Sequence, residues 1–188
     1  MTVTNALIAA GSNATSPAGH PNVTILSALS ALNHDSFAIV AKSRLFETPA
    51  FPQGAGPDFV NTAVLAETTM SPEAVLAHLH AVEAAHGRVR NKRWGPRTLD
   101  LDLIGWGDAV RPDRPTWRRW AGLSAVSAAR ETPQELILPH PRLAERAFVL
   151  VPLLDIAPDW THPVTGLSVA QMAAALPQKA RDEIKPLS

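Results

Sequence analysis

The amino-acid sequence predicts an α+β fold, in which helices pack on an antiparallel sheet. Three observations support this class. Short runs of β-forming residues alternate with segments of helical periodicity, two of these runs follow each other without a helix between them, and glycine, proline or capping residues separate most segments. A chain of 188 residues has room for one proper core, so we expect residues 1–188 to form a single domain.

The first half of the chain supplies a strand, a helix and a second strand. Residues 5–10 (NALIAA) predict a short buried strand, closed by the turn sequence Gly-Ser-Asn. Apolar residues recur at three-residue steps over residues 23–32, which predicts a helix. Residues 37–46 are rich in β-forming side chains and predict one strand. Three prolines and two glycines within residues 48–58 then predict a long loop, and long ordered loops are often functional.

The next three elements complete the core. Residues 59–68 predict a strand that pairs antiparallel with residues 37–46 across the loop. Residues 71–86 begin with Ser-Pro-Glu and are followed by glycine, which is typical of a capped helix. Residues 98–104 predict the last strand. The order βαββαβ is that of a ferredoxin-like core.

The remaining segments lie outside that order. Residues 105–135 interrupt the pattern and predict an insertion. Helical patterns return around residues 141–154 and 167–176, so we expect C-terminal helices. The last residues of the chain are expected to be frayed.

Composition excludes several classes of function. Lys plus Arg and Asp plus Glu both number 17, and this balance argues against a bulk nucleic-acid or membrane-surface binder. The absence of cysteine excludes disulfides, thiolate zinc sites and thiol nucleophiles. The N-terminal residues do not resemble a signal peptide, and no apolar run reaches membrane-spanning length. We therefore expect a cytoplasmic protein with neither nucleic acid nor membrane as its partner.

Residues 93–104 (RWGPRTLDLDLI) carry the first chemical signal. In a strand, residues two apart share one face at a separation of roughly 6.5–7 Å, so Asp100 and Asp102 lie together and the alternating leucines lie opposite. Two carboxylates so close repel each other unless a cation lies between them. Mg²⁺ is the natural candidate because it takes one or two carboxylates together with phosphate oxygens. An amphipathic strand with a solvated face remains the alternative.

A run of positive charge precedes the carboxylates. Five basic residues and no acidic residue lie between positions 88 and 97: Arg88, Arg90, Lys92, Arg93 and Arg97. Arginine forks suit phosphate oxygens, so basic groups beside a carboxylate pair indicate a metal–nucleotide site. A solvated basic loop is the alternative. Trp94, within the run, could stack on a flat heteroaromatic ligand or anchor the loop.

The segment GRVRNKRWGPRTLDLDLI resembles the signature of the 6-hydroxymethyl-7,8-dihydropterin pyrophosphokinase family. Three further segments resemble that family in the same order: IAAGSN, FETPAFPQGAGPDFVNTAV and LPHPRLAERAFVLVPLLDIAPDW. Together they cover most of residues 5–160 apart from the insertion. The resemblance implies an enzyme of folate biosynthesis that transfers pyrophosphate from ATP to 6-hydroxymethyl-7,8-dihydropterin and releases AMP. It further implies two Mg²⁺ ions, ATP and the pterin as ligands, and a monomer or at most a weak dimer.

The resemblance also implies roles for individual residues. The metal ligands would be Asp100 and Asp102. The catalytic cations acting on the triphosphate would be Arg88, Arg90 and Arg97. The nucleotide would be bound by Glu83, Arg90, Arg97, His140 and Arg146. The pterin pocket would be formed by Thr48, Pro49, Phe51, Phe59, Asn61, Trp94 and Phe148.

The sequence departs from the family pattern at several positions. Phe59 replaces a frequent tyrosine, and Pro141 replaces a common aromatic residue after His140. Glu135 and Ile137 stand where basic and hydroxyl contacts to ATP are often found. The insertion carries Trp117, Arg118, Arg119 and Trp120. It could cover the adenine, pack on the sheet or form an interface.

Two other functions are compatible with parts of the pattern. RNA-recognition modules share the βαββαβ order, but their aromatic strand motif is absent here, and unpaired carboxylates would repel phosphates. An ordinary kinase that transfers the γ-phosphoryl group would release ADP instead of AMP. The nucleotide product therefore distinguishes the two kinds of kinase.

Overall fold

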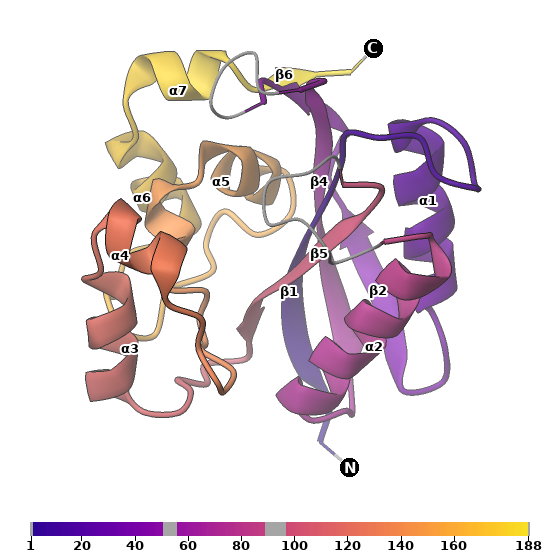
Figure 1. Cartoon of the computed structure of the whole chain (residues 1–188). Coiled ribbons are helices and arrows are strands. Elements are labelled where there is room, and N and C mark those ends of the chain that lie inside the picture. Colours follow the sequence, from indigo (N-terminus) through magenta and orange to yellow (C-terminus); the bar gives the residue numbers. More distant parts are fainter. Residues whose placement is uncertain (1, 51–55, 89–96, 188) are drawn as a thin grey trace.

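A computed structural model describes residues 2–50, 56–88 and 97–187. Its strands form an antiparallel sheet in the order β5-β1-β4-β3-β6, with β2 also paired to β4 (Figure 1). The strands are β1 (Thr4–Ser12), β2 (Phe37–Lys42), β3 (Phe46–Thr48), β4 (Phe59–Thr68), β5 (Asp100–Trp106) and β6 (Lys185–Pro186). With helices α1 (Pro21–Leu32) and α2 (Pro72–Ala85), this confirms the α+β class and the ferredoxin-like order predicted from the sequence.

Helices cover both faces of the sheet. Helices α1 and α2 pack on one face, whose core includes Ile8, Leu79 and Leu101. Helices α5 (Ala147–Leu154) and α6 (Val169–Ala175) contribute to the core on the other face, together with Leu7 and Ile104. Neighbouring residues of β1 thus enter different cores because successive side chains of a strand point to opposite faces. Figure 1 shows the sheet between these two helical layers.

The prediction of one continuous strand over residues 37–46 is wrong. The segment is divided into β2 and β3, which both pair with β4. Ser43 lies at the break, where its Oγ accepts a hydrogen bond from the Ala63 N–H at 3.0 Å and donates to the Arg44 carbonyl at 2.7 Å. A side-chain hydroxyl thus takes a hydrogen bond that a regular strand would receive on its backbone, and this interrupts the ladder.

The insertion expected over residues 105–135 begins slightly later, because β5 continues to Trp106. It contains α3 (Arg114–Ala121) and α4 (Ala125–Arg130). Asp113 caps α3 by accepting a hydrogen bond from the Thr116 N–H at 2.8 Å. A short 3₁₀ helix (Leu143–Glu145) then leads into α5.

Residues 178–187 form regular structure, so the expectation of fraying is wrong for this last described segment. Helix α7 (Gln178–Asp182) is followed by β6, which pairs with β3. The Leu187 N–H also donates to the Leu45 carbonyl at 2.8 Å. The outer edge of β3 offers hydrogen-bonding groups, and the terminal segment pairs with them. Within the described part of the chain, no helix is long and apolar enough to span a membrane.

Candidate active site

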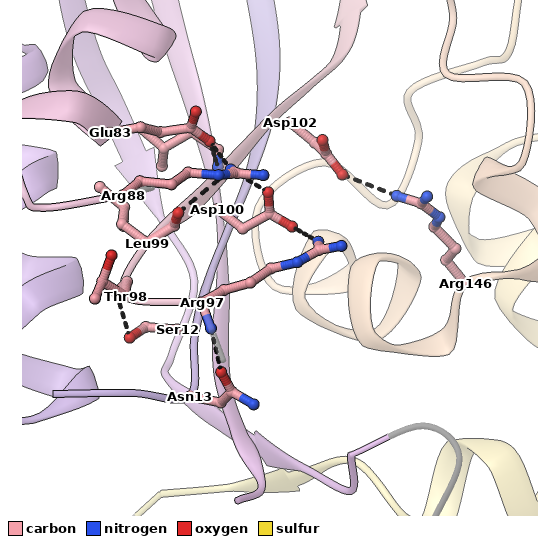
Figure 2. A network of polar contacts seen from close by, with 11 residues as sticks. Ser12, Asn13, Glu83, Arg88, Arg97, Thr98, Leu99, Asp100, Asp102 and Arg146 are labelled. Atoms are coloured by element: carbon pink, nitrogen blue, oxygen red, sulfur yellow. Dashed lines mark hydrogen bonds and ion pairs between the residues drawn. The ribbon is translucent and has the colours of Figure 1, made fainter. Parts of the chain in front are cut away.

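Strand β5 presents two carboxylates on one face, as its alternation predicts. Asp100 lies opposite Gly11 of β1, and Asp102 lies opposite Ala9. Leu101 and Leu103 are buried in the core beneath α1 and α2. The carboxylate pair, Asp100 and Asp102, therefore faces the same side of the sheet as α5, where Figure 2 shows Arg146.

Asp100 is held by two guanidinium groups. One carboxylate oxygen pairs with Nη1 of Arg88 and the other with Nη1 of Arg97. Arg88 also pairs with Glu83 and donates to the Leu99 carbonyl at 3.3 Å (Figure 2). Burial acts to lower the pKa of Arg88, but the charges of Asp100 and Glu83 outweigh it and raise that pKa, so the guanidinium stays charged.

Glu83 lies beneath this network, near the end of α2. The residue is only 1% exposed, and its Oε1 accepts a hydrogen bond from the Leu101 N–H at 2.7 Å. The same oxygen pairs with Arg88. Glu83 thus joins α2, Arg88 and β5, and its expected effect on a nucleotide would act through Arg88.

Asp102 has a different partner. Its Oδ2 accepts a hydrogen bond from Nη1 of Arg146 at 2.8 Å, from the start of α5. Burial alone would raise the pKa of the Asp102 carboxyl, but the charge that the His140 ring carries at acidic pH and the charge of Arg146 outweigh it and lower the pKa. Arg146 also lies over the ring of Phe148, with Cζ 5.6 Å from the ring centroid. The two carboxylates are therefore each matched by positive charge from different parts of the chain.

His140 is neutral at pH 7. Burial lowers its pKa to about 4, and the positive charge of Arg146 adds to the decrease. Its Nδ1 accepts a hydrogen bond from the Arg142 N–H at 3.2 Å, so the ring proton lies on Nε2. His140 can therefore donate one hydrogen bond from Nε2. Its ring also lies close enough to Asp102 for each group to affect the pKa of the other.

The N-terminal turn anchors the beginning of this site, a role that the sequence did not reveal. Asn13 and Arg97 are joined by two hydrogen bonds, from the Asn13 N–H to the Arg97 carbonyl at 3.0 Å and from the Arg97 N–H to Asn13 Oδ1 at 2.8 Å. Ser12 Oγ donates to the Thr98 carbonyl at 2.6 Å, and Asn13 Nδ2 donates to the Pro57 carbonyl at 3.1 Å. The signal in the sequence that could have indicated this role was the pair of polar residues, Ser12 and Asn13, at the end of a buried strand.

Three of the residues expected around a pterin lie together on β3 and β4. Asn61 and Thr48 are buried, and Asn61 Nδ2 donates to Thr48 Oγ1 at 2.6 Å. Phe59 is the strand partner of Thr48. Gly11 lies against this group, where an added Cβ would stand 2.5 Å from Asn61 Oδ1. A side chain at position 11 would therefore displace the Asn61 amide from its present position.

The other pterin-side residues are more dispersed. Pro49 is exposed and lines a cavity of about 460 Å³, with Glu47, Asp58 and charged residues of positions 179–185. Phe148 is 39% exposed and belongs to α5, beside Arg146. Phe51, Arg90 and Trp94 lie outside the described residues, so their roles stay predictions.

The fold and the site define a ferredoxin-like α+β protein in which a carboxylate pair and several guanidinium groups meet on one face of the sheet. Residues 7–158 match the family model of 7,8-dihydro-6-hydroxymethylpterin-pyrophosphokinase. The chain belongs to this family.

Individual relatives agree with that assignment. A 2-amino-4-hydroxy-6-hydroxymethyldihydropteridine pyrophosphokinase of Synechocystis is 39% identical over 131 residues, which are 70% of this chain and 54% of the relative. The enzyme of the same name from Pseudomonas aeruginosa is 34% identical over 171 residues, or 90% of both chains. The chain thus spans about half the length of the first relative and most of the second.

Solved structures support the fold. A crystal structure of HPPK-DHPS in complex with substrates superimposes with a TM-score of 0.64 at 13% identity, covering 93% of this chain and 43% of the other. Wild-type HPPK-DHPS of Plasmodium falciparum gives a TM-score of 0.62 at 14% identity, covering 92% and 44%. At this identity the similarity concerns the fold alone.

Proposed function

We propose that the protein transfers the β,γ-pyrophosphoryl group of ATP to the hydroxymethyl oxygen of 6-hydroxymethyl-7,8-dihydropterin. The products are the dihydropterin diphosphate and AMP, and the reaction belongs to folate biosynthesis. The observation that carries this proposal is the carboxylate pair on β5 with Arg88, Arg97 and Arg146 around it. Family membership supports ATP and the dihydropterin as the substrates of such a site.

The carboxylate pair suits Mg²⁺. The low pKa keeps Asp102 ionised, and guanidinium cations already lie against both carboxylates, so this place favours positive charge. Among the described residues there is no cluster of three or more His, Asp or Glu side chains for a metal. This agrees with Mg²⁺, which takes one or two carboxylates and completes its shell with phosphates and water. Asp100 and Asp102 would hold two ions, which when bound would neutralise the triphosphate.

The arginines bind and orient the triphosphate. Arg88, Arg97 and Arg146 each pair with a carboxylate, and each offers a planar fork that also fits phosphate oxygens. With a triphosphate bound, these guanidinium groups would hold its phosphate oxygens in place of the carboxylate oxygens that they contact here. Positioning and charge neutralisation of this kind dominate phosphoryl-type transfer. Arg90 is expected to join them on the family pattern.

The remaining groups select the substrates. The neutral His140 donates from Nε2 to the nucleotide, without adding charge. The Asn61 amide, fixed by Thr48, reads the hydrogen-bonding edge of the pterin, and Phe59 and Phe148 offer rings for stacking. We also expect a cytoplasmic enzyme that is a monomer or at most a weak dimer, and both statements stay predictions from the sequence.

One assay tests the reaction directly. The protein is mixed with ATP, MgCl₂ and 6-hydroxymethyl-7,8-dihydropterin, and the released nucleotide is identified by chromatography. AMP, formed together with the pterin diphosphate, is the expected product. Release of ADP would instead indicate transfer of the γ-phosphoryl group, and the absence of any pterin-dependent product would reject the proposal.

A further inference from the structure

The inserted helix α3 contacts the segment that carries His140. Trp117 of α3 is only 6% exposed, and its Nε1 donates a hydrogen bond to the Pro139 carbonyl at 2.7 Å. Pro139 directly precedes His140. A buried indole N–H needs an acceptor and a buried carbonyl needs a donor, so this bond is costly to lose for both partners.

Residues 138–140 are also held from two other directions. Leu138 and Arg111 exchange two backbone hydrogen bonds, of 2.9 and 3.2 Å, at the base of the insertion. The His140 N–H donates to the Ile104 carbonyl of β5 at 2.8 Å. The backbone that aims the His140 ring is therefore fixed between the insertion and the strand that carries the carboxylate pair.

Helix α3 itself is secured on its far side. The ring of Trp117 lies edge-to-face with His162 at a centroid distance of 5.0 Å, and Trp160 lies 5.9 Å from the same imidazole. Arg114 donates from Nη2 to the Pro163 carbonyl at 2.8 Å. Trp117 thus packs against His162 on one side and donates a hydrogen bond to Pro139 on the other. The packing against His162 therefore helps to fix residues 138–140.

We propose that Trp117 is a positioning residue for the nucleotide side of the site. Through the Pro139 carbonyl it fixes the backbone of residues 138–140, and hence the direction in which His140 donates. The inserted helix therefore sets the affinity for ATP and leaves the pterin side, on β3 and β4, unaffected. This inference rests on the proposed function, because it takes His140 as a nucleotide contact.

The test is Trp117→Phe, which keeps an aromatic ring against His162 and removes the N–H. Trp120→Phe is the matched control, because it makes the same change on the same helix at a half-buried position where Arg119 lies over the ring. Binding of α,β-methylene ATP with Mg²⁺, and separately of the pterin, is measured by calorimetry. Trp117→Phe should weaken nucleotide binding by up to about five- to tenfold, which is the worth of the one hydrogen bond that a misaligned His140 would no longer donate to the nucleotide. Pterin binding should stay within about twofold, and Trp120→Phe should leave both affinities unchanged.

A double-mutant cycle with His140→Ala separates positioning from general destabilisation. If Trp117 acts through His140, Trp117→Phe should add little to the loss already caused by His140→Ala. Arg114→Ala, which frees α3 from Pro163 at an exposed position, should weaken nucleotide binding in the same direction but less. This second variant keeps the test open if Trp117→Phe folds poorly.

Several outcomes would overturn the inference: unchanged nucleotide affinity in Trp117→Phe, equal losses for nucleotide and pterin, or full additivity with His140→Ala. Failure of the proposed function is recognised separately in the wild-type protein. A wild type that binds the nucleotide without releasing AMP rejects the reaction but still permits the binding test. A wild type that binds no nucleotide rejects both.

Discussion

Glu83 offers a demanding test of how the site is supported. It is 1% exposed and accepts from both the Leu101 N–H and Arg88, whose side chain is only 18% exposed. Glu83→Ala would leave a buried backbone N–H unpaired and would remove one of the two carboxylates that neutralise Arg88. Breaking a buried ion pair from one side costs about 3–5 kcal/mol. Glu83→Gln keeps an acceptor but loses the charge, and Arg88 retains Asp100, so we expect a smaller loss of about 1–3 kcal/mol.

Urea unfolding monitored by circular dichroism measures these losses. For a chain of this length, a loss of 3–5 kcal/mol corresponds to a decrease in Tm of about 6–20 °C. Glu73→Ala, an exposed acidic residue in the first turn of the same helix, is the control and should cost less than about 1 kcal/mol. If Glu83→Ala were no more destabilising than Glu73→Ala, the support attributed to Glu83 would be refuted.

Three further predictions concern single residues. Asp100→Ala or Asp102→Ala should nearly abolish turnover while the chain still folds, and near-normal Mg²⁺-dependent activity in either variant would reject its role as a metal ligand. Arg97→Ala should slow the chemical step in single-turnover experiments more than it weakens pterin binding in equilibrium titrations, whereas equal effects would count against a role in transfer. Burial lowers the pKa of His162 in the folded protein. Below about pH 6.5 the unfolded chain therefore binds more protons at this residue than the folded protein does, so the free energy of unfolding decreases as the pH falls. His162→Asn, which keeps an acceptor for the Val164 and Thr165 N–H groups, should show a flatter loss of Tm on acidification, and an unchanged acid limb would contradict this.

Local patterns predicted the elements of the core, because their physical causes lie within a few residues. The Ser-Pro-Glu start of α2 and the Asp-Leu alternation of β5 both depend on immediate neighbours. The break between β2 and β3 depends on a hydrogen bond that Ser43 accepts from the Ala63 N–H of a different strand, so periodicity alone did not reveal it. The polar residues Lys42, Ser43 and Arg44 in the middle of the segment were the local sign of a break.

The arrangement of the site was predictable in part. The carboxylate pair and the basic run before it are adjacent in sequence, and their chemistry could be inferred together. The pairing of Arg146 with Asp102 joins residues 44 positions apart, and Trp117 meets Pro139 through an insertion without recognisable periodic features. Such contacts depend on tertiary packing, which one sequence does not encode in any local pattern.

Metal binding tests the central claim most directly. Mn²⁺ takes the same oxygen ligands as Mg²⁺ and is detected by electron paramagnetic resonance. With α,β-methylene ATP present, the wild-type protein should retain two Mn²⁺ ions per chain after equilibrium dialysis, and Asp100→Asn/Asp102→Asn should retain fewer and bind them more weakly. Equal numbers of ions with equal affinity in both proteins would contradict the assignment of this carboxylate pair as the metal site.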